Sequence, residues 1–507
     1  MNFTSFLDVN AKLYGEKIAI IYAEANMSHT SINHSSINHP SISYSSLLKY
    51  VNSLALELKE LGIRKGDRVL IATGNRPESI ISYFAVWRIG AISIPINPDF
   101  KAYELSNIID HSKPKIAIIR DSLPISNIES IKISMKENGL NLHPENLSYD
   151  DVCHIQYTSG TTGKPKGVML THGNWMAAVE AERWALNLND NDIYLGFYPH
   201  FHVGVSWGIT ALKYGATFII MERYNLLEFL KLAKEYNATI VSGMPPVLYE
   251  LANSSMNIED YLKSVRCIIT GGATTPEAVW RTFSERFSNI KVVNAYGLSE
   301  TLVIGSGTVV PYHLQHLSKG FRSVGLPVGY TEVKIVDSSN PNKELPCGEI
   351  GEIAIRGPGV AKGYWMNPED TSKAFLNDGW FLTGDLGYLD EDGVLYITAR
   401  KKDVIIMSGW KIYPSEVEEV LLKHPKIAEA AVFSRYDERR GEIPAAAIVL
   451  KPGEKASPEE IIEFCRGRLA GYKVPRYVIF LDELPKMNAW KILRRVLREK
   501  YGGFPQT

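Results

Sequence analysis

One stretch, residues 157–172, reads YTSGTTGKPKGVMLTH and is the most informative part of the chain. Its glycines let the backbone turn sharply and bring N–H groups close to an anion. Its hydroxyl side chains add hydrogen-bond donors and Lys166 adds a positive charge, so the segment suits a polyphosphate. It is not a Walker A loop, because Gly160 and Gly163 are separated by two residues instead of four and Pro165 stands where the loop lysine would be followed by Ser or Thr.

The composition around this stretch is that of an ordinary soluble enzyme. The 507 residues are 45% hydrophobic and 22% charged, with a formal net charge of -1, which gives no electrostatic case for nucleic acid or an anionic membrane. The four cysteines lie far apart and no pair has metal-ligand or redox-motif spacing. We therefore expect a cytoplasmic protein with no signal peptide and no transmembrane segment.

The order of the patterns predicts an α/β protein with two domains. From Leu47 onward, apolar strand runs alternate with helical periods, which favours layered sheets with flanking helices. After Gly325, short strands separated by Gly, Pro and Asp turns indicate a β-rich subdomain. We expect residues 1–400 to form the large N-terminal domain and residues 401–507 a small α+β C-terminal domain.

The segment 24–41 is a polar insertion between two expected short strands. It contains SINH at residues 31–34 and again at 36–39. The five-residue spacing of its histidines fits neither one helix face nor the common zinc patterns. A hairpin loop lengthened by duplication is the better interpretation.

Residues 157–172 resemble the phosphate-loop signature of the adenylate-forming superfamily, which contains acyl-CoA synthetases, aryl-CoA ligases, peptide-synthetase adenylation domains and firefly luciferase. Further signatures follow in the family order and extend the resemblance over nearly the whole chain: NAYGLSET at 294–301, WFLTGD at 380–385, RKKD at 400–403, and PK through Lys491 to RR at 485–495. The resemblance implies an enzyme that activates a carboxylic acid with ATP and then forms a thioester with coenzyme A.

The resemblance also assigns the nucleotide site. The phosphates would be held by Thr158, Ser159, Gly160, Thr161, Thr162 and Lys166, with Glu300 and Thr158 as ligands of Mg²⁺. The adenine would lie against Gly271, Gly272, Ala273, Asn294, Ala295 and Tyr296, with Ser299 and Thr301 close to the nucleotide. Asp385 would hold the ribose hydroxyls and Arg400 would assist at the ribose and phosphate.

Lys491 resembles the catalytic lysine of the family, which acts on the α-phosphate, and Glu300 and Thr158 are the other two residues expected to be catalytic. The family usually has Gly immediately before this lysine, whereas this chain has Trp490. Lys402 corresponds to the hinge of a mobile C-terminal domain. Its Ser408, Gly409 and Trp410 would enter the site for the CoA step.

The acyl pocket is expected from His202, Val203, Trp207, Gly297 and Val303. Acetyl-CoA synthetases carry Trp at the position of Gly297, so glycine predicts room for a longer acid. A medium- or long-chain fatty acid is our first expectation and an aryl acid such as a cinnamate is the second.

Three other functions compete with a CoA ligase. A stand-alone enzyme that loads a carrier protein is one. A luciferase-like enzyme is disfavoured, because such enzymes have Lys at the position of Ile406. A non-catalytic sensor is disfavoured by the retention of Lys491, Glu300, Asp385 and Arg400. Since relatives are often dimers, we expect a possible homodimer.

Overall fold

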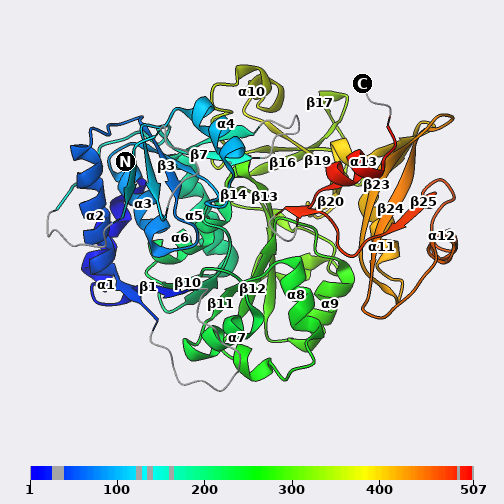
Figure 1. Cartoon of the computed structure of the whole chain (residues 1–507), viewed down its shortest axis with the longest axis horizontal. Coiled ribbons are helices and arrows are strands. Elements are labelled where there is room, and N and C mark those ends of the chain that lie inside the picture. The colour runs from blue at the N-terminus through cyan, green and yellow to red at the C-terminus, as the bar shows by residue number, and fades with distance from the viewer. Residues whose placement is uncertain are drawn as a thin grey trace.

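The computed structural model describes residues 2–24, 39–121, 128–133, 141–158, 165–487 and 491–504. Two sheets form the body of the N-terminal part (Figure 1). The first has the order β6-β5-β3-β4-β7-β8 and is parallel except at β7–β8, which pair antiparallel. Its strands are β6 (Ser130–Lys132), β5 (Ile116–Ile119), β3 (Arg68–Ala72), β4 (Ile92–Pro95), β7 (Val152–Thr158) and β8 (Lys166–Thr171).

The second sheet has nine strands in the order β15-β14-β13-β12-β11-β9-β10-β1-β2. Its centre, from β13 to β1, is parallel, and the pairs β1–β2, β13–β14 and β14–β15 are antiparallel. Its strands are β15 (Leu326–Pro327), β14 (Val303–Val310), β13 (Lys291–Leu298), β12 (Cys267–Gly271), β11 (Ile240–Ser242), β9 (Ile193–Gly196), β10 (Thr217–Met221), β1 (Ile18–Ala23) and β2 (Ser41–Ser43).

Helices cover these sheets, and side-chain caps fix where several of them begin. Ser43 caps α2, Thr171 caps α5 and Asn225 caps α7, each accepting a hydrogen bond from a backbone N–H of the first turn. The N-terminal helices are α1 (Phe6–Tyr14), α2 (Tyr44–Glu60), α3 (Pro77–Arg88), α4 (Ala102–Ser112), α5 (His172–Leu186), α6 (Ser206–Lys213), α7 (Leu226–Glu235), α8 (Pro245–Asn253), α9 (Glu277–Arg286) and α10 (Pro368–Ala374). The largest apolar cluster draws on both sheets and on α2, α3, α5 and α6, so the main core lies where the two sheets meet.

A third, antiparallel sheet follows, in the region where the sequence indicates a β-rich subdomain. Its order is β17-β16-β18-β19-β20. The strands are β17 (Asn340–Glu344), β16 (Glu332–Asp337), β18 (Gly351–Arg356), β19 (Phe381–Leu389) and β20 (Leu395–Arg400). Tyr296 of β13 packs in one apolar cluster with residues of this sheet, which ties it to the end of the nine-stranded sheet.

The residues after Arg400 build a separate sheet with its own core (Figure 1, orange and red). The order is β22-β21-β24-β23, and β25 pairs with β24. The elements are β21 (Ile405–Met407), β22 (Trp410–Ile412), α11 (Pro414–Leu421), β23 (Ile427–Asp437), β24 (Gly441–Leu450), α12 (Pro458–Arg466), β25 (Tyr477–Phe480), the hairpin β26 (Lys486–Met487) and β27 (Lys491–Ile492), and α13 (Arg494–Tyr501). The expected α/β class, with a large N-terminal part and a smaller C-terminal one, is confirmed.

None of the helices that the structure describes combines the length and apolar character needed to cross a bilayer. Of the histidines in the polar insertion, His29 and His34 lie outside the described residues, and His39 is buried.

Candidate active site

The phosphate-loop segment connects the two antiparallel strands at the edge of the six-stranded sheet. Thr158 ends β7 and lies opposite Lys166, the first residue of β8. Both side chains are half-buried. The connecting residues 159–164, and with them Ser159, Gly160, Thr161 and Thr162, lie outside the described residues, so their roles stay predictions.

Lys166 and Glu300 meet the same tyrosine. The hydroxyl of Tyr364 donates to Glu300 Oε1 at 3.0 Å, and the ammonium of Lys166 lies 5.0 Å from the centre of the Tyr364 ring. Lys166 also pairs with Asp370 of α10 at 2.9 Å, and this bond lowers the pKa of the Asp370 carboxyl. The structure therefore brings together two residues that the sequence assigns to the phosphates and the metal.

Sequence reasoning missed Tyr364 and Asp370. The signature around them, GYWMNPED at 363–370, marks only the start of a helix, where Asn367 caps α10. No periodicity or charge pattern in the chain connects this segment to the phosphate loop, which lies nearly two hundred residues earlier. Only the tertiary structure shows that it runs beside β8.

A second cluster joins Asp385 and Arg400, which the resemblance assigns to the ribose, with Tyr296, which it assigns to the adenine. Asp385 of β19 is buried; its Oδ2 accepts from the Tyr296 hydroxyl at 2.8 Å and its Oδ1 pairs with Arg400 Nε at 2.6 Å. Asp385 and Arg400 are also direct partners across β19 and β20. Burial, with a contribution from Asp385, raises the pKa of Tyr296 well above its usual value, so its phenol remains a donor.

The segment expected beside adenine lies where two parallel strands end. Gly271 ends β12 and lies opposite Ala295 of β13, and a Cβ on Gly271 would lie 2.5 Å from the Ala295 carbonyl oxygen. Gly272 has a φ of 74°, which favours glycine, and it is exposed, while Ala273 is half-buried. The side-chain amide of Asn294 donates to the Ser323 carbonyl at 2.9 Å, so this amide makes a structural contact within the protein.

The turn after Ser299 carries backbone strain. Leu302 and Val303 have positive φ values of 46° and 54°, and such a conformation is a genuine outlier for a β-branched residue. The buried hydroxyl of Thr301 accepts from the Leu298 N–H at 2.9 Å and donates to the Val303 carbonyl at 3.0 Å. Such strain persists only where the surroundings enforce it, and here the Thr301 hydroxyl helps to enforce it.

The structure contradicts the reason given for glycine at position 297. A Cβ on Gly297 would lie 1.6 Å from the carbonyl oxygen of Val303, so backbone fills the direction that a side chain would take. Its φ does not lie in the positive range. Glycine is required because two strands approach closely, and Gly297→Trp would disturb this turn instead of reporting on an acyl pocket.

The remaining candidates for the acyl pocket belong to one apolar region. Val203 and Trp207 are buried members of the main core, and the half-buried Val303 packs against it. His202 is half-buried beside the Phe201 ring. The neighbouring His200 is a structural residue: its ring bonds the Ser79 hydroxyl, and burial lowers its pKa to about 3, so it stays neutral.

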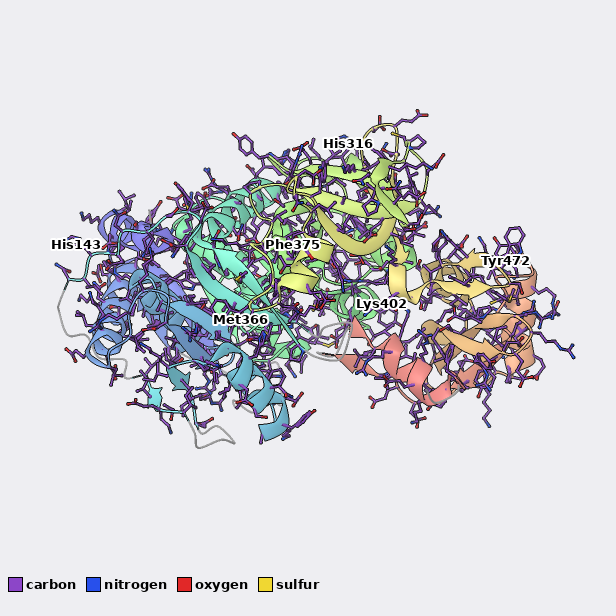
Figure 2. All side chains as sticks on the ribbon, turned by 90° about the horizontal axis from the view of Figure 1, so that it is seen from above. His143, His316, Met366, Phe375, Lys402 and Tyr472 are labelled. Carbon is purple, nitrogen blue, oxygen red and sulfur yellow. The ribbon has the colours of Figure 1, made fainter. Side chains whose placement is uncertain are left out.

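The C-terminal candidates lie at and beyond the junction between the two parts. Figure 2 shows Lys402 at this junction, where its side chain is exposed. Ser408 and Gly409, with φ values of 51° and 86°, form the turn between β21 and β22. The Trp410 side chain is 60% exposed, and its ring lies 5.1 Å from that of Tyr472.

Lys491 belongs to the strand β27, but its side chain and the whole of Trp490 lie outside what the structure describes. The nearby Arg494 is fixed by a bidentate bond to Glu418 at 2.7 Å and by Asp403 at 3.8 Å. This contact anchors the start of α13 to α11 and to the junction. The sequence analysis includes Arg494 in the last signature but assigns it no role.

Comparison with known proteins assigns the family. The model of the AMP-binding enzyme family matches residues 7–365, and that of the AMP-binding enzyme C-terminal domain matches residues 416–491. A 2-succinylbenzoate–CoA ligase of Bacillus cereus is 35% identical over 456 residues, covering 89% of this chain and 92% of its own. A long-chain-fatty-acid–CoA ligase of Bacillus subtilis is 35% identical, covering 88% of each chain, and a 4-coumarate–CoA ligase of Nicotiana tabacum is 34% identical, covering 88% and 87%.

Solved structures agree with this assignment. ATP-bound MatB of Rhodopseudomonas palustris superposes with a TM-score of 0.86 at 28% identity, covering 99% of each chain. The o-succinylbenzoate CoA synthetase of Bacillus subtilis, solved with its acyl-adenylate intermediate, gives 0.84 at 30% identity and the same coverage. The chain belongs to the AMP-binding enzyme family, and it is an AMP-forming ligase of the adenylate-forming superfamily.

Proposed function

We propose that this enzyme is an acyl-CoA synthetase that converts a carboxylic acid and ATP into an acyl-adenylate and pyrophosphate, and then transfers the acyl group to coenzyme A with release of AMP. The observation that carries the proposal is that the signature residues gather in two polar clusters, one of Tyr296, Asp385 and Arg400 and one in which Tyr364 joins Lys166 and Glu300. Such a site offers oxygen acceptors for sugar hydroxyls and a cation for phosphates.

The adenylation step joins two anions, so the site has to neutralise charge and align the reactants. Lys166 would exchange Asp370 for phosphate oxygens, and Asp385 would offer its buried oxygens to the ribose hydroxyls. Arg400, beside Asp385, would face the phosphate side, and Lys491 would approach the α-phosphate.

The donor set fits Mg²⁺. Glu300 supplies a carboxylate and Thr158 a hydroxyl, and Mg²⁺ is held in such sites by one or two carboxylates together with substrate phosphates. Tyr364 bonds Oε1 of Glu300, which holds the carboxylate in one orientation. When bound, the ion would neutralise charge on the phosphates.

The identity of the acid is a separate part of the proposal. The apolar, buried character of Val203 and Trp207 supports a medium- or long-chain fatty acid. An aryl acid is the second candidate, because the relatives of similar identity include ligases for 2-succinylbenzoate and for 4-coumarate. A carrier protein in place of CoA is the alternative acceptor.

The direct experiment measures pyrophosphate release across a panel of acids, with and without CoA, at fixed Mg²⁺ and ATP. We expect AMP and pyrophosphate as products, faster turnover with CoA, and a preference for longer fatty acids. Formation of ADP and phosphate would contradict the proposal. Acyl transfer to a phosphopantetheinyl carrier but not to CoA would favour the alternative acceptor, and a preference for aryl acids would favour the second acid class.

The role of Lys491 is tested by separating the half-reactions. Lys491→Ala should reduce adenylate formation about a hundredfold or more, the usual scale for a preorganised charge. Thioester formation from supplied acyl-adenylate should survive much better, since the C-terminal part would have turned about Lys402 and brought Ser408, Gly409 and Trp410 into the site. Equal losses in both half-reactions would contradict this alternation. Gel filtration of the same protein tests for the proposed homodimer.

A further inference from the structure

We propose that Tyr364 is a positioning residue that holds Glu300 and Lys166 at a fixed separation, so that one can bind the metal and the other the phosphates. The proposal rests on the proposed function. Its geometric basis is that one buried side chain contacts both charged groups, Glu300 through its hydroxyl at 3.0 Å and Lys166 through its ring at 5.0 Å.

The backbone around Tyr364 is fixed against the strand that begins with Lys166. Tyr364 forms a bridge with Val168 of β8. The Met169 N–H donates to the Gly363 carbonyl at 2.9 Å, and the Trp365 N–H donates to the Gly167 carbonyl at 2.7 Å. The segment therefore behaves as an added strand beside β8, and its register places the Tyr364 side chain next to Lys166.

The ring itself has little freedom. Tyr364 is 7% exposed. Its ring packs edge-on against Phe375 at 5.3 Å, and its N–H donates to the Thr371 hydroxyl at 3.0 Å. A ring held in this way is a rigid spacer: its hydroxyl donates to Glu300, and its face contacts the ammonium of Lys166.

Glu300 and Lys166 have opposite charges and would gain Coulomb energy by pairing directly. Such a pair would use up the carboxylate needed for a cation and the ammonium needed for phosphates. The Tyr364 hydroxyl instead donates to the carboxylate, and the electron-rich ring face attracts the ammonium.

Asp370 completes the arrangement on the other side of Lys166. It lies on α10, a few residues after Tyr364, and gives the ammonium a half-buried carboxylate partner at 2.9 Å. Phosphate oxygens would replace this partner, while the contact with the Tyr364 ring would remain. Tyr364 is therefore the element of the cluster that does not have to move when nucleotide binds.

Tyr364→Phe is the sharpest test, because it keeps the ring and removes only the hydroxyl. We expect the Mg²⁺ concentration needed for half-maximal adenylation to rise about tenfold, the scale of one hydrogen bond to a charged group, while KM for the acid and the rate of thioester formation from supplied acyl-adenylate stay unchanged. Tyr364→Leu removes the ring too, and should in addition weaken binding of ATP without metal.

Tyr224→Phe is the matched control, since the Tyr224 hydroxyl also donates to a carboxylate, Glu250, at 2.7 Å, away from the site. It should change neither the Mg²⁺ requirement nor the ATP affinity. An unchanged Mg²⁺ requirement in Tyr364→Phe, or equal losses in both half-reactions, would overturn the proposal.

Calorimetric binding of Mg²⁺ with a non-hydrolysable ATP analogue separates this proposal from the proposed function. If the wild type activates no acid in the panel, the proposed function fails, yet the binding measurement still compares wild type with Tyr364→Phe. Weaker Mg²⁺-dependent binding in the variant would support the positioning role, and identical binding would overturn it.

Discussion

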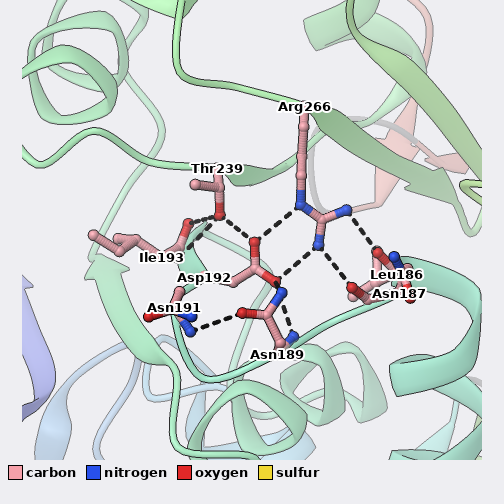
Figure 3. Close-up of polar contacts among 8 residues, drawn as sticks. All are labelled: Leu186, Asn187, Asn189, Asn191, Asp192, Ile193, Thr239 and Arg266. Atoms are coloured by element: carbon pink, nitrogen blue, oxygen red, sulfur yellow. Dashed lines mark hydrogen bonds and ion pairs between the residues drawn. The ribbon is translucent and has the colours of Figure 1, made fainter.

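Two Asp–Arg pairs, each with a buried aspartate, have different surroundings in this molecule. In the first, Arg266 contacts both oxygens of Asp192 and also donates to the carbonyls of Leu186 and Asn187 at 2.8 and 3.3 Å (Figure 3). Asp192 in turn accepts from the Asn189 backbone and side chain and from Thr239. The pair ties the end of α5 to the starts of β9, β11 and β12, so it stabilises the sheet.

The second pair, Asp385 with Arg400, lies across the neighbouring strands β19 and β20. Asp385 accepts from Tyr296 and pairs with one nitrogen of Arg400. The Arg400 side chain is 38% exposed, against 22% for Arg266, although both aspartates are almost fully buried. The comparison teaches that similar ion pairs can differ in their surroundings: Arg266 also donates to two backbone carbonyls, whereas Arg400 is more exposed, as the ligand contact that we propose for it requires.

The largest effect is expected on the structural pair. Asp192→Asn leaves the Arg266 charge uncompensated in a mostly buried place, and we expect a loss of about 3–5 kcal/mol in the free energy of unfolding. The activity of the protein that remains folded should be close to that of wild type. Denaturant unfolding and active-site titration measure the two quantities, and a variant of normal stability with lost activity would reverse the comparison.

Asp385→Asn is the same substitution in the pair formed by Asp385 and Arg400. It keeps an acceptor for the Tyr296 hydroxyl but loses the charge and one acceptor for the ribose. We expect adenylation to fall about a hundredfold, equivalent to about 2.7 kcal/mol, with a thermal midpoint within about 2 °C of wild type. Steady-state pyrophosphate release and a thermal melt measure both. A large drop in the midpoint with normal kcat would place this pair in the structural class.

Glu182 extends the comparison of buried carboxyls, because its hydrogen-bond donors are hydroxyls, whereas Asp192 and Asp385 are paired with arginines. Ser206 and Thr210 of α6 donate to it, and burial raises its pKa from an ordinary 4.5 to about 8. Between these pH values the folded protein keeps a proton that the unfolded chain has released. Its contribution to stability is therefore full below about pH 4.5 and falls as the pH rises towards about 8.

We expect Glu182→Gln to remove this loss of stability at rising pH, because glutamine has no proton to release. Between about pH 5 and about pH 8, the stability of the variant relative to wild type should rise by at least about 1.4 kcal/mol, the equivalent of a tenfold change in an equilibrium constant. Unfolding curves at both pH values measure it. The histidines with lowered pKa values, such as His200, remain in both proteins and cancel in the difference. A parallel pH dependence of the two proteins would show that Glu182 is ionised in the fold.

The smallest effect concerns the geometry of the exposed guanidinium. Arg400→Lys keeps the charge but loses the planar fork, and we expect KM for ATP to rise about tenfold, the scale of one charge-assisted hydrogen bond. Arg266→Lys is the matched variant and should lower the thermal midpoint without changing KM. A normal KM in Arg400→Lys would mean that Arg400 contributes only to the Asp385 pair.

The fold could be predicted well from local pattern, because strand and helix periods are properties of contiguous residues. The apolar runs KIAIIY at 17–22, DRVLIATG at 67–74 and VRCIITGG at 265–272 read as strands, and they coincide with β1, β3 and β12 to within a few residues. The motif order also located Asp385, Arg400 and Tyr296, and the structure brings them together. The role of Gly297 was misjudged, since its requirement comes from the Val303 carbonyl across a turn.

By itself, the sequence determined the family and the α/β class with a large N-terminal part and a smaller C-terminal one, because these depend on periodicity and on short motifs. Only the tertiary structure decided that Arg266 also bonds backbone carbonyls while Arg400 is more exposed, that Glu182 is buried against two hydroxyls, and that Tyr364 contacts both Glu300 and Lys166. These contacts join residues that are far apart in the chain, and their energies depend on burial and on neighbouring groups that no local pattern specifies.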